Sequence, residues 1–188
     1  SDSSFAPAQR DLDAAELWAG CKAVARAVQP EQGVAETVEI ADDYTNQDLT
    51  TEDGFVYAAK LVMRIKVGGL LAMAPVCSSW VFANMVNTKR SKADPAGDRS
   101  YGPVVQGNIM AKVAAFFLLL AYARELFAFM ENPAASMIFR YSPVKLAVDF
   151  LTRAANGHFV IFNACRYSEL PLGQRSKKPF KVFAIGKI

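Results

Sequence analysis

The fold is decided by Ala74-Pro75-Val76-Cys77-Ser78-Ser79-Trp80, read together with Glu131-Asn132-Pro133 further along the chain. Each of these clusters follows a short apolar run, residues 70–73 in the first case and 126–130 in the second. An apolar helix is expected between them, over residues 108–122. The pattern predicts two strands of one α/β sheet. Both would end at the carboxyl edge of that sheet, where open α/β sheets bind their ligands.

Strands and helices are expected to alternate along the rest of the chain. The alternation predicts an α/β fold, namely a Rossmann-like, mostly parallel sheet with helices on both faces. Gly68-Gly69 is expected to end the helix that begins near Thr51. Residues 1–13 are expected to be an extended lead-in, and residues 14–188 to form one domain. The predicted strands are 14–19, 36–41, 70–74, 126–130, 158–165 and 180–185, and the predicted helices are 22–28, 51–65, 108–122 and 143–155.

Composition favours one globular domain with a sizeable core, since the 188 residues are 52% hydrophobic and 21% charged. The longest apolar run, residues 113–123, is shorter than the roughly 20 residues of a membrane span. It is interpreted as a buried helix. No transmembrane segment is therefore expected, while peripheral association with a membrane stays open. The absence of an initiator methionine is interpreted as a removed targeting segment or a shortened chain.

Cysteine and histidine usage argues against a disulfide framework and against a metal site. The three cysteines, Cys21, Cys77 and Cys165, are odd in number and far apart, which favours a reducing compartment. No spacing of cysteines or histidines fits zinc. The single histidine, His158, is interpreted as structural rather than as part of a nucleophile–histidine pair.

Charge is divided unevenly along the chain. Residues 1–60 carry 12 acidic and 4 basic side chains, whereas residues 61–188 carry 6 acidic and 17 basic ones. The basic residues form two clusters that predict either solvated loops or contact with an anionic partner. No aromatic side chains are interleaved as a nucleic-acid stacking platform requires, which favours solvated loops. The clusters are Lys89, Arg90, Lys92 and Arg99, and Arg175, Lys177, Lys178 and Lys181.

A series of short motifs resembles the S-adenosylmethionine-dependent carbon-5 cytosine methyltransferases, and is similar to a group of methyltransferase-like algal proteins. The resemblance extends from Glu16 to Phe183. Its motifs, in order, are Leu17-Trp18-Ala19-Gly20, an acid after the second strand, Asp48-Leu49, Pro75-Val76-Cys77-Ser78 and Glu131-Asn132-Pro133.

The resemblance implies a role for each matched position. Gly20 would let the backbone approach the methionine part of the cofactor. Glu39, or Asp42 in another register, would bind the ribose hydroxyls, and Asp48 would lie near the adenine. Cys77 would attack carbon 6 of a flipped cytosine. Glu131 would hold the base edge and assist protonation.

Two departures from the family weaken the implied activity. The first turn reads Ala19-Gly20-Cys21-Lys22, with Lys22 where the family has a second glycine. The Lys22 side chain is expected to occupy cofactor space and to repel a sulfonium. In addition, a target-recognition region is not expected in the few residues after Phe183.

The sequence therefore predicts a catalytically inactive accessory or structural subunit that uses no cofactor. Its partners would be protein subunits of a larger assembly, and the algal resemblance implies an organellar, plastid photosynthetic one. An active methyltransferase of the cytoplasm or nucleus, acting on nucleic acid or protein through Cys77 and Glu131, is the alternative. A nucleic-acid-binding module is the third hypothesis. Structural roles remain open for Cys77 as a buried side chain and for Glu131 as an acceptor of backbone amides in its own turn.

Overall fold

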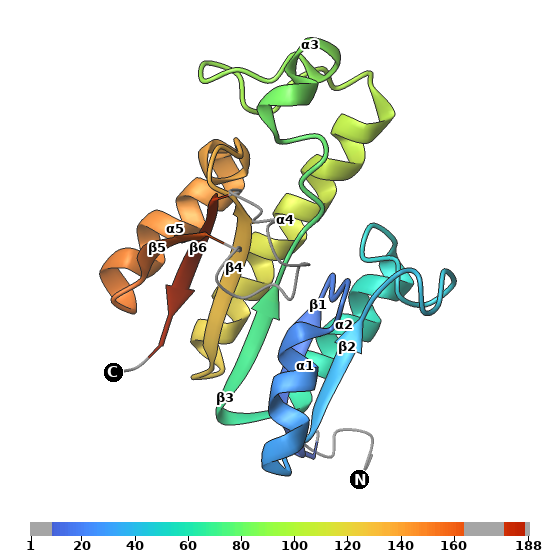
Figure 1. The fold of residues 1–188 in the computed structure, drawn as a ribbon, viewed down its shortest axis with the longest axis vertical. Coiled ribbons are helices and arrows are strands. Elements are labelled where there is room, and N and C mark those ends of the chain that lie inside the picture. Colours follow the sequence, from blue (N-terminus) through green and yellow to red (C-terminus); the bar gives the residue numbers. More distant parts are fainter. Residues whose placement is uncertain (1–8, 164–178, 187–188) are drawn as a thin grey trace, which may run out of the picture.

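The chain forms a six-stranded mixed sheet with helices on both faces (Figure 1). The computed structural model describes residues 9–163 and 179–186. The strand order is β2-β1-β3-β4-β6-β5. The strands are β1 (Leu12–Leu17), β2 (Ala35–Val38), β3 (Ile65–Met73), β4 (Phe127–Pro133), β5 (His158–Asn163) and β6 (Pro179–Ile185).

The α/β class predicted from sequence is confirmed, and the arrangement is consistent with a Rossmann-like fold. The expected mostly parallel sheet is found only in part. Strands β2, β1, β3 and β4 pair in parallel, whereas β6 runs antiparallel to both β4 and β5. The sheet is mixed because β6, the last strand in the chain, enters between β4 and β5 in the opposite direction. Strand β1 begins at Leu12, two residues before the predicted start of the domain.

The helices divide unequally between the two faces of the sheet. Among the described helices, α1 alone packs on one face, against β1 and β2, while α2, α4 and α5 cover the other (Figure 1). The short helix α3 lies in a lobe of residues 75–101 beyond the carboxyl end of β3. The helices are α1 (Ala23–Val28), α2 (Glu52–Arg64), α3 (Met85–Thr88), α4 (Gly102–Ala123) and α5 (Ser142–Ala154).

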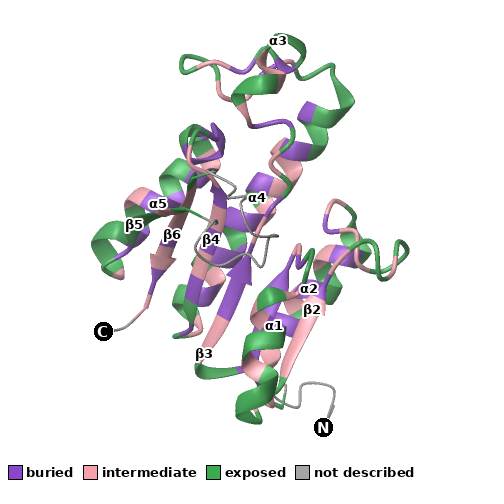
Figure 2. Ribbon diagram, viewed as in Figure 1, coloured by how far each residue is buried: buried purple, intermediate pink, exposed green. Residues whose placement is uncertain are grey.

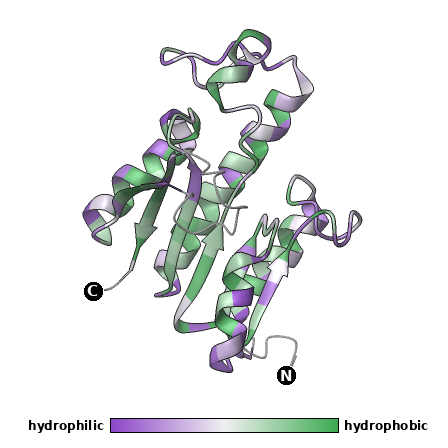
Figure 3. Cartoon of the chain, in the orientation of Figure 1, coloured by the Kyte–Doolittle hydropathy of each residue, from purple (hydrophilic) through white to green (hydrophobic). Residues whose placement is uncertain are grey.

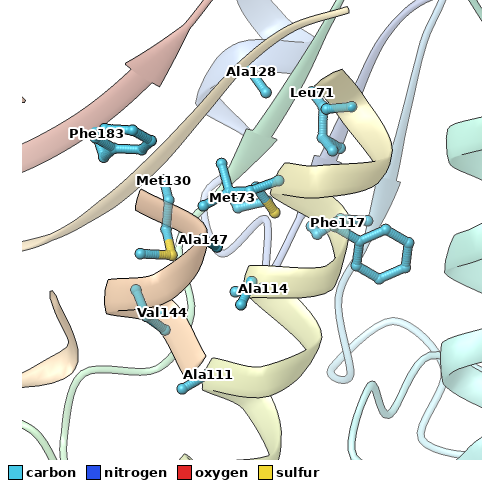
Figure 4. Close-up of a cluster of buried hydrophobic side chains, with 14 of the residues drawn as sticks. Leu71, Met73, Ala111, Ala114, Phe117, Ala128, Met130, Val144, Ala147 and Phe183 are labelled. Atoms are coloured by element: carbon cyan, nitrogen blue, oxygen red, sulfur yellow. The ribbon is translucent and has the colours of Figure 1, made fainter. Parts of the chain in front are cut away.

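The core lies between the sheet and the helices α4 and α5 (Figure 4). Leu17, Met73, Met130 and Phe183 lie opposite one another across four strands, and all are fully buried. Figure 2 shows buried segments along the central strands β3 and β4. The strands that carry this row are strongly apolar at the centre of the sheet (Figure 3). Burying side chains of this size stabilises the fold by roughly 1.5–3 kcal/mol each. The helices present small side chains to the row, which allows close approach: Ala111, Ala114 and Ala147.

Gly68-Gly69 does not end a helix, so that prediction is wrong. Helix α2 ends at Arg64, and β3 begins at the next residue. The glycines lie inside β3 at an irregularity where its register against β1 shifts. Gly68 has φ of 74° and a Cβ on Gly69 would lie 2.8 Å from a backbone oxygen of β1. Glycine is therefore required by the bulge rather than by a helix end.

The composition of helix α4 predicted a helix that is buried all round, but one side of the helix is exposed. Phe116 is 45% exposed and Leu119 is 39% exposed. Within the described residues α4 is the one helix long and apolar enough to span a membrane, and 44% of its most apolar window is buried in the protein. It covers the sheet with one side only. Hydropathy cannot distinguish the side that packs on the sheet from the side that faces outward.

Helix α2 begins with a tightly packed cap. The Thr51 hydroxyl accepts a hydrogen bond from the Gly54 amide at 3.1 Å, which satisfies a free donor of the first turn. A Cβ on Gly54 would lie 2.0 Å from the Asp48 carbonyl oxygen. The loop and the helix can approach this closely only because residue 54 has no side chain.

Replacing Gly54 by alanine should therefore destabilise the protein. We expect G54A to lower the free energy of unfolding by about 2–3 kcal/mol, because the new methyl group forces the loop off the helix. Gly102, also at the start of a helix, has open space around it. G102A should change the free energy by less than about 0.5 kcal/mol. Urea denaturation of both variants checks this, and equal stabilities would contradict it.

Candidate functional site

A pocket of about 310 Å³ opens at the carboxyl ends of β1, β3 and β4. The chain leaves β1 towards β2 and leaves β3 towards β4, so the loops diverge on either side of this crevice. This is the topological switch point where open α/β sheets bind ligands. The lining is mostly apolar, and its two carboxylates come from Glu16 and Glu131.

Glu16 anchors helix α1. Its buried carboxylate accepts hydrogen bonds from the Val24 amide at 3.1 Å and the Ala25 amide at 3.2 Å. Helix α1 has no acidic residue in its first turn and no side-chain cap at Lys22. The Glu16 carboxylate therefore supplies the negative charge that a helix amino terminus favours. Burial raises the pKa of Glu16, although the amides of the helix act to lower it.

The turn after β1 has a backbone shape that normally requires glycine. Trp18 (φ 55°), Gly20 (φ 49°) and Lys22 (φ 56°) all adopt the left-handed conformation. A non-glycine residue in this conformation costs roughly 1–2 kcal/mol. Of these three left-handed positions, one carries the glycine that adopts this conformation most readily.

Two contacts join this turn to the loop after β2. The Gly20 amide donates to the Glu39 carboxylate at 2.8 Å, and the Lys22 ammonium lies 2.7 Å from Asp42. The Lys22 side chain therefore points to the β2 loop and is not among the residues lining the pocket. Glu39 also accepts from the Ala41 amide at 3.4 Å. The turn amide and the acid that the resemblance assigns to a cofactor are thus bonded to each other.

Asp48 belongs to the segment that leads into α2. Its carboxylate accepts hydrogen bonds from the Thr50 amide at 2.9 Å and the Thr50 hydroxyl at 2.7 Å. Its carbonyl oxygen accepts from the Thr51 hydroxyl at 2.8 Å. Such an Asx turn stabilises the approach to a helix cap. These contacts give Asp48 a structural role in the described chain.

Cys77 and Glu131 do not line the same pocket. Glu131 lines the crevice, whereas Cys77 lies in the loop after β3, where its carbonyl oxygen accepts from the Trp80 amide at 2.9 Å. Burial raises the pKa of Glu131. Within the described residues its carboxylate has no hydrogen-bond or ion-pair partner, so the bonds expected to backbone amides of its own turn are not found there. Cys77 is half-buried.

Asn132 fixes the end of β4 against the loop after β3. Its side-chain amide donates to the Pro75 carbonyl oxygen at 2.8 Å, and the residue is buried. Its Oδ1 is buried without a hydrogen-bond partner in the described part of the chain. The motif Glu131-Asn132-Pro133 was identified from sequence, but the role of its central residue was missed because it depends on a contact 57 residues away.

The loop after β3 is organised by Arg90, which the sequence assigned to a basic surface cluster. Arg90 is 2% exposed, and its guanidinium lies 3.4 Å from the centre of the Trp80 ring. Burial lowers the pKa of Arg90 to about 10. Every hydrogen bond found for its guanidinium is to a neutral oxygen, on Ser79, Pro95, Ala96, Val104 and Asn108.

The first basic cluster is therefore only in part a free cationic surface, of which Lys92 is the exposed member without an ion pair in the described residues. Arg90 is buried, Lys89 pairs with Asp98 at 2.6 Å, and Arg99 lies 3.6 Å from Asp94. Most of the second cluster, Arg175, Lys177 and Lys178, lies outside the described residues, as does Cys165. Within residues 9–163 and 179–186 no group of three histidine, cysteine or acidic side chains could hold a metal ion.

Models of known protein families give no match to the chain, and neither do curated protein sequences.

Removing the Arg90 guanidinium should unfold the lobe. We expect R90M to lower the free energy of unfolding by about 3–5 kcal/mol, because it leaves several buried oxygens without donors. The exposed neighbour Lys92 provides a matched control, and K92M should change stability by less than about 0.5 kcal/mol. Guanidinium denaturation followed by tryptophan fluorescence measures both. A loss below about 1 kcal/mol in R90M would contradict the structural role.

Glu131 should destabilise the protein where it is ionised. Its pKa in the folded state lies above the ordinary value of 4.5, so folding favours the protonated form. Stability from this group is present below pH 4.5 and is lost as pH rises through the folded pKa. E131Q should therefore raise the melting temperature at pH 7 but not at pH 4.

Thermal denaturation across that pH range measures the effect, with the exposed Glu31 as the control. E31Q should leave the melting temperature unchanged at both pH values. A lower melting temperature of E131Q at pH 7 would show that the carboxylate has a stabilising cationic partner.

Proposed function

We propose that the protein is a methyltransferase-like α/β protein that does not use a methyl donor and acts as an accessory or structural subunit of a larger protein assembly. The strand order around the switch point and the pocket at the carboxyl ends support the methyltransferase-like fold. Following the algal resemblance, the proposal extends to a photosynthetic assembly of the plastid.

The observation that carries the proposal is the state of the turn after β1. A turn that binds a nucleoside cofactor offers free backbone amides, and a nearby acid binds the ribose. Here the Gly20 amide and the Glu39 carboxylate satisfy each other at 2.8 Å. The bond is exposed to solvent, so breaking it to admit a ligand would cost about 0.5–1.5 kcal/mol. The Lys22–Asp42 ion pair joins the same two loops.

The absence of Cys77 from the pocket lining also supports a protein that does not transfer methyl groups. Covalent catalysis requires a nucleophile and an acid that face one bound substrate. Glu131 lines the crevice, but Cys77 does not. The loop that carries Cys77 is instead held by the buried Arg90–Trp80 stack. This loop has the contacts expected of a packed structural element.

One observation favours the alternative, an active S-adenosylmethionine-dependent methyltransferase acting on nucleic acid or protein. Glu131 is a half-buried carboxylate that faces an apolar pocket. Groups of this kind are common in active sites. In that case Cys77 and Glu131 would be catalytic, and Gly20, Glu39 and Asp48 would bind the cofactor.

Titration calorimetry with S-adenosylmethionine separates the two functions. The wild-type protein should release no heat at ligand concentrations of about 100 µM, since the amide and the acid are already bonded. K22G frees the β2 loop from its ion pair, and K92G is the control on the exposed surface. Micromolar binding by the wild type, with methyl transfer that C77S abolishes, would establish the alternative instead.

A further inference from the structure

One stripe of helix α4 faces away from the sheet and is almost entirely apolar. Its members are spaced alternately four and three residues apart, and the stripe extends about 27 Å at 1.5 Å per residue. Ile109 is half-buried and the others are exposed. The stripe consists of Val105, Ile109, Lys112, Phe116, Leu119 and Ala123.

The spacing is that of a coiled-coil seam. Alternating steps of four and three give a period of 3.5 residues, which places the seam against a second helix over its whole length. A helix that faces water normally carries polar residues on its outer side. The outer side of α4 carries Phe116 and Leu119, which are 45% and 39% exposed.

The helices beside α4 extend this apolar surface. On α5, Leu146 is 67% exposed and Phe150 is exposed beside it. The rings of Phe150 and Tyr122 lie 5.8 Å apart and connect α5 to α4. On the other side, Phe55 of α2 lies 5.1 Å from Phe116. The seam therefore lies in a continuous apolar patch, as interaction surfaces do.

We propose that the α4 stripe binds a second copy of this chain, with the two α4 helices antiparallel about a two-fold axis. The stripe is centred at position 114, so antiparallel copies place Val105 opposite Ala123 and Ile109 opposite Leu119. They also place the one charged residue, Lys112, opposite the Phe116 ring of the other copy. A lysine over an aromatic face is attractive, and the two-fold axis forms this contact twice.

Lys112 also discriminates against the other occupants of the stripe. Parallel copies would place the two Lys112 ammonium groups against each other, which is repulsive. Insertion into a lipid bilayer would bury the same charge in hydrocarbon. The antiparallel dimer gives each of the six positions a partner on the other copy. The dimer does not depend on whether the crevice binds a cofactor.

Sedimentation equilibrium across the micromolar range tests the dimer. We expect the wild type to have twice the mass of the chain, and F116E to weaken association at least tenfold. Phe82, which is 77% exposed on the distant lobe, is the matched control, and F82E should associate like the wild type. A wild-type monomer throughout the range, or a dimer that F116E leaves unchanged, would overturn the proposal.

Disulfide trapping tests the orientation, in a protein whose native cysteines are replaced by serine. V105C combined with A123C should form covalent dimers rapidly, whereas V105C alone should not. Rapid trapping by V105C alone would identify a parallel pair and overturn the antiparallel one. A monomeric protein that floats with anionic phosphatidylserine vesicles, and loses this binding in F116E, would assign the stripe to a membrane.

Discussion

The hydrogen bond from the Gly20 amide to the Glu39 carboxylate closes the turn after β1 against the loop after β2. It joins the turn after β1 to the loop after β2, and the Lys22–Asp42 ion pair joins the same two loops. The first contact uses the amide and the acid that the resemblance assigns to a cofactor. A ligand has to compete with hydrogen bonds that the protein already makes, and only a ligand that replaces both would bind tightly.

The same turn keeps a strained backbone conformation. Trp18 and Lys22 adopt backbone conformations suited to glycine, and the surrounding contacts maintain them. Glu16 holds the first amides of α1, and Trp18 packs against the core. The strain of roughly 1–2 kcal/mol per residue is small beside the burial of the central row of side chains. The sheet therefore retains its crevice although the turn that serves it is closed.

Local patterns in the sequence predicted most of the helices and strands to within three residues, because apolar period, proline and glycine act over short distances. Helix α5, with Pro143 in its first turn, is an example. Helix α4 and strand β3 begin six and five residues before their predicted starts, and helix α3 was not predicted. Features that depend on distant partners were missed. Gly68 is at a bulge created by the register of β1 against β3, and Arg90 is buried against the ring of Trp80 in a folded lobe. Cys77 follows β3, whereas Glu131 lies inside the neighbouring strand β4. Only Glu131 lines the crevice, because Arg90 and Trp80 organise the loop that carries Cys77.

The closed turn is tested most directly by nuclear magnetic resonance of the Gly20 amide during titration with S-adenosylmethionine. We expect the chemical shift of this amide and its rate of exchange with solvent to remain unchanged at millimolar ligand, because the Glu39 carboxylate keeps its hydrogen bond. A saturable shift of the Gly20 amide, together with a change at the Glu39 side chain, would show that the turn opens to a methyl donor and would contradict the scaffold function.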